Sequence, residues 1–126
     1  MDEDRLSPDL GRLIDQAKAA ARSLGGEDPA IEAVALLTDG GEIYTGATLG
    51  APPLSAAHLA LERAREARAG EVLAAAIAAP YDPAETVLPS VATYERLAGL
   101  DPELPLVLKQ HGRWVMLGAD KVTPTS

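Results

Sequence analysis

Two residue types that often carry catalysis or hold metals, cysteine and histidine, are absent or scarce in this 126-residue chain. It has no cysteine, which excludes disulfides, thiol nucleophiles and thiolate metal sites, and its two histidines, His58 and His111, are too few for a multi-histidine zinc centre. His58 and Glu62 are four residues apart, so on a helix they would share one face and could hold a metal or pass a proton. A surface histidine beside a solvated carboxylate is the simpler interpretation, because two ligands make a weak metal site.

Two hydroxyl residues, Ser90 and Thr93, form the other candidate pair. They could in principle act as nucleophiles, but no histidine lies near Ser90 in the sequence to activate it. Ser90 also precedes a predicted helix, where serine is an ordinary N-cap residue. The cap is the favoured interpretation, and His111, in a polar turn, receives no role.

The charge and length of the chain exclude several classes of protein. The formal net charge is −8 and no Lys/Arg cluster is dense enough to follow a phosphate backbone, so we expect no nucleic-acid partner. The acidic start Asp2-Glu3-Asp4 and the lack of a long apolar run predict neither a signal peptide nor a membrane span, and hence a cytoplasmic protein. The length fits a single domain over residues 1–126.

Hydrophobic periodicity and breaker residues predict the elements that must position these side chains. The predicted order is α-β-β-α-β-α-β-β. A helix covers about 8–24, a β-hairpin pairs 31–37 with 42–47, a helix runs from Ser55 toward Gly70, a strand covers 72–79, a loop covers 80–89, a helix runs from Ser90 to Ala98 and is stopped by Gly99, and two strands cover 104–108 and 114–117.

The charged residues of the helix after Ser55 alternate in sign. They are Glu62, Arg63, Arg65, Glu66 and Arg68. A solvated helical face with local charge pairing is the simplest interpretation, and subunit contacts are the alternative.

The hairpin segment Ala30–Ala47, which reads AIEAVALLTDGGEIYTGA, is similar to the opening hairpin of cytidine deaminases. The order of elements also matches that family, so the resemblance implies a three-layer α/β/α fold with a mixed five-stranded sheet. In that family one His or Cys from the next helix and two Cys from the helix after the third strand hold a zinc ion. A nearby glutamate carries the proton from the zinc-bound water to the leaving ammonia.

The positions that match the zinc motifs lack both cysteine ligands and, in the first alignment, the proton-carrying glutamate. Aligning His58-Leu59-Ala60 with the family's His-Ala-Glu keeps one possible ligand but places Ala60 at the proton-carrying glutamate. The proline-cysteine motif matches Pro89 to Thr93, with Ser90 and Thr93 in place of both thiolates. An alternative alignment restores the glutamate as Glu62 but places Ala60 at the ligand position. Neither gives a complete zinc site, so we expect no metal and no other cofactor.

The nucleoside-binding side of the predicted pocket has changed as well. The run that matches the family's Asn-x-Glu-Asn reads Thr48-Leu49-Gly50-Ala51 and lacks the groups that would hold a ribose. Thr48, Glu62, Tyr81 and Tyr94 remain as possible pocket residues. The two tyrosines are equally interpreted as filling the core or as lining a cavity or interface.

These losses favour a non-catalytic protein with a cytidine deaminase-like fold, one without catalytic residues, that acts through oligomerisation, a partner or an unidentified small ligand. The alternative is a cytidine deaminase-like hydrolase with an atypical site built on His58 and Glu62. A homo-oligomer is expected from the resemblance, because the family forms dimers and tetramers, and from a small, alanine-rich core that gains from burying more surface.

Overall fold

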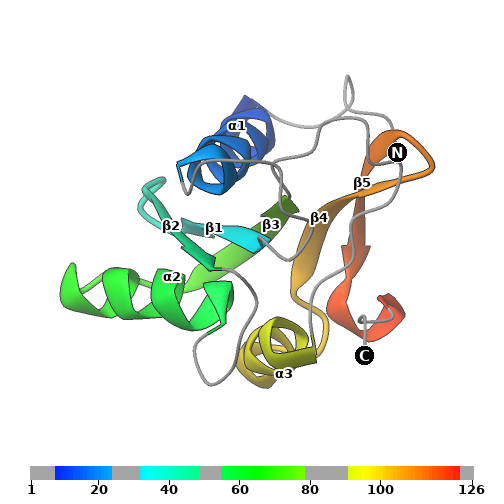
Figure 1. Cartoon of the computed structure of the whole chain (residues 1–126). Coiled ribbons are helices and arrows are strands. Elements are labelled where there is room, and N and C mark those ends of the chain that lie inside the picture. Colours follow the sequence, from blue (N-terminus) through cyan, green and yellow to red (C-terminus); the bar gives the residue numbers. More distant parts are fainter. Residues whose placement is uncertain (1–7, 24–31, 49–54, 79–90, 123–126) are drawn as a thin grey trace.

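The computed structural model describes residues 8–23, 32–48, 55–78 and 91–122 (Figure 1). The predicted order of helices and strands is confirmed, with one short 3₁₀ helix added at the end. The elements are α1 (Pro8–Arg22), β1 (Glu32–Thr38), β2 (Ile43–Thr48), α2 (Ala56–Glu66), β3 (Val72–Ala78), α3 (Val91–Leu100), β4 (Pro105–Gln110), β5 (Arg113–Gly118) and η2 (Ala119–Lys121).

The five strands form one sheet in the order β2-β1-β3-β4-β5. The β1–β2 and β4–β5 pairs are antiparallel hairpins, β1 pairs with β3 antiparallel, and β3 pairs with β4 parallel. A parallel pair needs a crossover connection, and α3 lies in the segment that joins β3 to β4. The predicted mixed five-stranded sheet is therefore confirmed.

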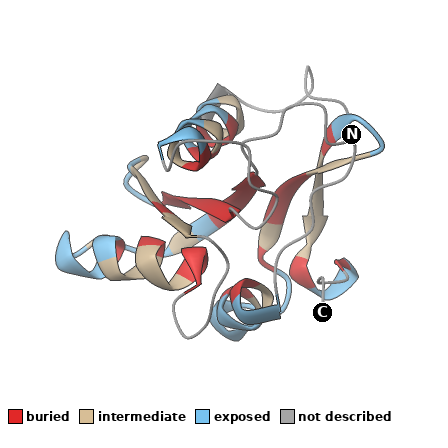
Figure 2. Ribbon diagram, in the orientation of Figure 1, coloured by how far each residue is buried: buried red, intermediate tan, exposed pale blue. Residues whose placement is uncertain are grey.

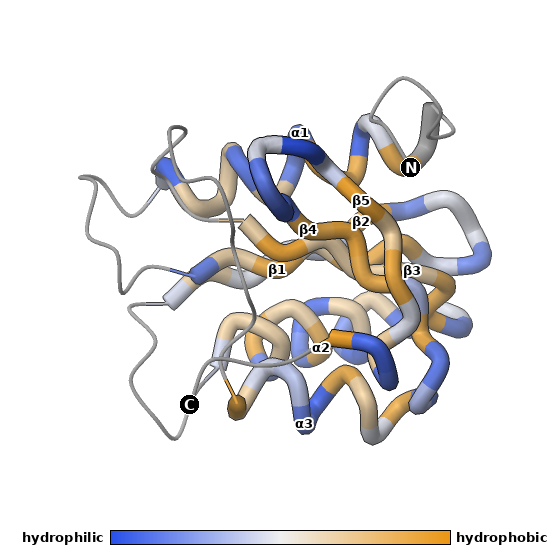
Figure 3. Tube along the Cα trace, turned by 90° about the vertical axis from the view of Figure 1, so that its right-hand side faces the viewer, coloured by the Kyte–Doolittle hydropathy of each residue, from blue (hydrophilic) through white to orange (hydrophobic). Residues whose placement is uncertain are grey.

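Helices cover both faces of the sheet, with α1 on one side and α2 and α3 on the other (Figure 1). Successive residues of a strand point to opposite faces, so β1 contributes Ala35 and Leu37 to the core under α1, and Val34 and Leu36 to the core under α2 and α3. Buried residues fill the middle of the sheet (Figure 2), and apolar residues follow the strands between the two helical layers (Figure 3). The chain has the three-layer arrangement that the sequence predicted.

The contact between α2 and β2 depends on a glycine. A Cβ atom at Gly46 would lie 2.5 Å from the carbonyl oxygen of Ala56 and 2.6 Å from the amide nitrogen of Ala60. Real Cβ atoms do not come this close to backbone atoms, so only glycine fits between the strand and the helix. The alanines of α2 add to the effect, because small side chains let the helix pack closely on the sheet.

Most predicted boundaries differ from the structure by one or two residues, and two of these differences have a clear physical reason. Helix α3 continues through Gly99 to Leu100 instead of ending at Ala98, because one glycine in a helix costs only about 1 kcal/mol and does not by itself end it. The last hairpin turns at His111 and Gly112, whose φ angles of 51° and 81° are both positive, as a two-residue type I′ turn requires. The polar stretch predicted as a longer turn therefore belongs mostly to β4 and β5. The predicted loop at 80–89 lies outside the described residues.

The first hairpin contains a tyrosine with a shifted pKa. The hydroxyl of Tyr44 on β2 donates a hydrogen bond to the carboxylate of Glu42, and this bond, with some burial and the negative charge of Glu42, raises the pKa of Tyr44 above its ordinary value.

Among the described residues, no helix is both long and apolar enough to cross a membrane.

Candidate functional site

The amino-terminal end of α2 is closed by hydrogen bonds from two different elements. Ser55 is the N-cap, and its hydroxyl accepts from the amide nitrogen of His58 at 3.1 Å. The amide of Ala57 donates to Oγ1 of Thr93, in the first turn of α3, at 3.4 Å. Helix amides at this end have no partner within the helix, so these two oxygens satisfy two of them.

Thr93 is fully buried, and its hydroxyl also donates a 2.5 Å hydrogen bond to Oε1 of Glu32. Glu32 is the first residue of β1 and is only 8% exposed. Thr93 thus connects the side-chain carboxyl group of Glu32, on β1, to the amino end of α2. A threonine hydroxyl can donate one hydrogen bond, and that of Thr93 donates it to Glu32.

Glu32 was not among the residues predicted to form a site. The available signal was its position as the one charged residue within the apolar run 31–37. Charged residues are rarely buried without a partner, so a charge inside a buried strand indicates a polar contact from another element. The partner, Thr93, is 61 residues away in the sequence.

His58 and Glu62 lie close together on α2, as their spacing predicted, with Nε2 of His58 3.8 Å from Oε1 of Glu62. Nη2 of Arg96 on α3 lies 2.9 Å from Nδ1 of His58. A guanidinium group only donates, so Nδ1 must accept and the ring proton is on Nε2, which faces Glu62. In this arrangement neither ring nitrogen offers a lone pair to a metal.

The other predicted site residues have separate environments. Ala60 is fully buried in the core under α2, Thr48 is half-buried at the end of β2, and Tyr94 is partly buried and packs against the same core as Ala60. The packing of Tyr94 favours the core-filling interpretation of that residue. Ser90 and Tyr81 lie outside the described residues.

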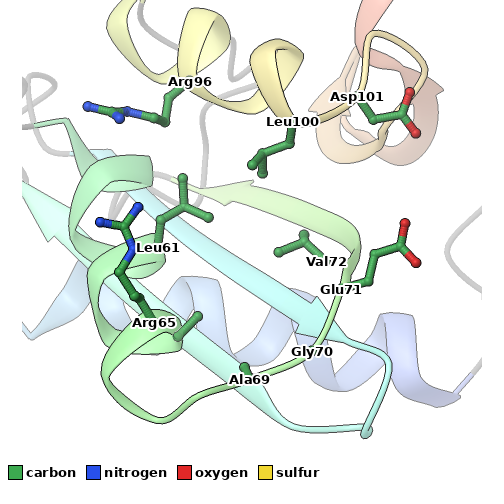
Figure 4. Close-up of a pocket in the computed structure, with 10 residues that line it drawn as sticks. Leu61, Arg65, Ala69, Gly70, Glu71, Val72, Arg96, Leu100 and Asp101 are labelled. Atoms are coloured by element: carbon green, nitrogen blue, oxygen red, sulfur yellow. The ribbon is translucent and has the colours of Figure 1, made fainter.

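A second surface lies at the other end of the same two helices. A hollow of about 440 Å³ is enclosed by the carboxyl-terminal halves of α2 and α3 and by the start of β3 (Figure 4). We call it the α2–α3 groove. Its lining includes the charged residues Arg65, Glu71, Arg96 and Asp101. Of these four, only Arg65 belongs to a charge pattern that is visible in the sequence, because the others become its neighbours only in the folded chain.

The residues present do not fit the zinc ion that the resemblance implies. The whole chain lacks cysteine, and the hydroxyl of Thr93 is engaged with Glu32 and Ala57. Within the described ranges, no group of three or more His, Cys, Asp or Glu side chains is placed to hold a metal ion. Buried hydroxyl groups in hydrogen bonds are poor zinc ligands.

Comparison with known proteins gives a structural relationship. No protein-family model matches the chain, and a search of curated proteins found no match. Among solved structures, the chain is similar to the cytidine deaminase from Burkholderia pseudomallei, with a TM-score of 0.69 and 24% sequence identity over 96% of this chain and 99% of that one. The chain therefore has a cytidine deaminase-like fold.

Proposed function

We propose that this chain is a non-catalytic protein built on the cytidine deaminase-like fold, and that it acts through oligomerisation or by binding a partner or small ligand. The observation that carries the proposal is the buried hydrogen bond between Thr93 and Glu32. The resemblance places a zinc thiolate at position 93, and the hydroxyl found there is instead committed to a carboxyl group and a helix amide. Without a zinc-bound water, the fold has no activated nucleophile to attack a cytosine ring.

The test is a joint measurement of metal content and deamination. Protein purified without chelator should contain far less than one zinc per chain after dialysis. It should release no ammonia from cytidine, deoxycytidine or cytosine above the uncatalysed rate. Near-equimolar zinc that survives dialysis, or deamination that depends on added zinc, would refute the proposal.

A hydrolase that uses His58 and Glu62 is the second candidate, and the 3.8 Å approach of the two side chains is what favours it. Such an enzyme would need a free ring nitrogen as base or ligand, whereas Arg96 is bonded to one nitrogen and Glu62 faces the other. Any hydrolytic activity found on nucleosides should therefore be tested with His58→Ala. Loss of activity in a folded variant would favour this candidate over the first.

A further inference from the structure

The α2–α3 groove has an apolar centre. Leu61 of α2, Val72 of β3 and Leu100 of α3 line it, and Leu100 is 48% exposed despite its apolar side chain (Figure 4). Leu100 is the last residue of α3 and lies between the other two elements of the groove in this view. Burying such a side chain in an interface would be favourable, since the hydrophobic effect scales with the apolar area removed from water.

The charges of the α2–α3 groove are separated by sign. Arg65 and Arg96 flank one end, and Glu71 and Asp101 flank the other, with the apolar residues between them (Figure 4). All four charged residues are exposed, and Arg96, which donates to Nδ1 of His58, has other N–H groups that can reach a partner. Along its length, the groove therefore has a basic end, an apolar centre and an acidic end.

We propose that the α2–α3 groove is a self-association surface, in which a second copy of this chain docks its own groove in the opposite direction. When two identical faces meet around a twofold axis that lies in the interface and crosses the groove at a right angle, each basic end meets the partner's acidic end. The apolar centres then meet each other near the axis.

The pattern of charge favours a second copy over a partner that carries one charge sign. A partner of one charge sign would be attracted at one end of the groove and repelled at the other. A second copy satisfies both ends with the same residues, so each groove complements itself. This also gives a role to the exposed arginine Arg65 of α2, which is only weakly paired within its own helix, 3.6 Å from Glu62.

Paired charge reversals test the proposal directly. Arg65→Glu with Arg96→Glu makes the groove acidic at both ends, and Glu71→Arg with Asp101→Asn makes it basic at both ends. Asn is used at position 101 because Oδ1 of Asp101 accepts from the amide of Glu103 at 2.9 Å, and an amide oxygen keeps that bond. Each variant should weaken self-association at least about 100-fold, since attractive pairs become repulsive in both halves of the interface.

Mixing the two variants provides the decisive measurement. Analytical ultracentrifugation or light scattering should show self-association of the wild type, its loss in each variant alone, and a heterodimer when the acidic and basic variants are mixed. Circular dichroism establishes that both variants are folded. Arg22→Glu with Arg113→Glu, on exposed residues of α1 and β5, makes the same change in net charge as the acidic groove variant but away from the groove, and should leave self-association unchanged.

Three outcomes would overturn the proposal: a monomeric wild type at micromolar concentration and low salt, self-association that survives in both groove variants, or a mixture of the two variants that stays monomeric. If the second copy binds at another surface, self-association survives in both groove variants. If the groove binds a different protein or a small ligand, the wild type is monomeric. The inference deepens the proposed function, but a monomeric protein without zinc or deamination would refute only this inference.

Discussion

Helices α2 and α3 differ at their two ends: polar groups are buried at the amino ends and exposed at the carboxyl ends. At the amino ends, the buried hydroxyl of Thr93 donates to the carboxyl group of Glu32 and accepts from the amide of Ala57. At the carboxyl ends, Arg65 and Arg96 face solvent beside a half-exposed leucine. Two amides at the amino end of α2 thus have partners within the chain, whereas at the carboxyl ends Arg65 is only weakly paired and Arg96, which donates to His58, keeps further N–H groups that can donate to another molecule. We infer that contacts with other molecules are made at the carboxyl ends.

The largest expected effect comes from restoring thiolates at the amino ends. The amide of Ala57 contacts the side chain of Thr93, which puts position 57 next to position 93. Ala57→Cys with Ser90→Cys and Thr93→Cys should therefore bind about one zinc per chain, because three thiolates with one open position suit this ion. The two Cys changes alone, relying on His58, should bind far less. Zinc content after dialysis measures the difference.

Two results would change this placement. Equal zinc uptake without the change at position 57 would show that His58 is the first ligand position. Uptake only with Ala60→Cys, in place of Ala57→Cys, would support the alignment that places the glutamate at Glu62. If none of the folded sets binds zinc, the two helix starts do not correspond to the zinc motifs, although the fold itself stands on the structural similarity.

The next effect concerns the buried hydrogen bond itself. Thr93→Val keeps the shape of the side chain but removes its hydrogen bonds to Glu32 and to the amide of Ala57, which should lower the free energy of unfolding by about 2 kcal/mol. Thr93→Ser keeps the hydroxyl and loses one buried methyl group, at a cost of about 1 kcal/mol. Urea unfolding of both variants measures the two values. Equal losses would mean that the methyl group, and not the hydrogen bond, is what matters at this position.

The smallest effect is expected in the groove. Arg65→Gln removes an exposed charge whose partner within the helix is Glu62, three residues earlier. In monomeric protein the free energy of unfolding should change by less than about 0.5 kcal/mol, because exposed pairs of this kind contribute little. A loss comparable with that of Thr93→Val, measured by the same urea unfolding, would show that the groove also stabilises the fold and would end the contrast between the two ends.

The fold was largely predictable because its signals are local. The apolar runs of β1 and β3, the turn after Thr38 and the serine cap of α2 each lie within a few residues, and each gave the correct element. Contacts between distant residues gave no such signal. Thr93 and Glu32 are 61 positions apart, and His58 and Arg96 are 38 apart, so only the packed structure shows that they meet.

The spacing of His58 and Glu62 correctly predicted that they would be neighbours, because helix geometry alone decides it. It could not predict that an arginine from another helix would bond to the imidazole. The grouping of basic and acidic residues in the α2–α3 groove was hidden for the same reason, since its members come from three separate elements.

Gly46 also determines how this chain can vary. No side chain fits between β2 and α2 at this position, so any relative that keeps the same approach of strand and helix must keep the glycine. An alignment of such relatives would show an invariant residue beside the amino end of α2, where a reader would look for ligand contacts. The glycine would be invariant because the backbones of β2 and α2 approach too closely for a side chain, and the same would hold in members that bind a substrate and in members that bind none.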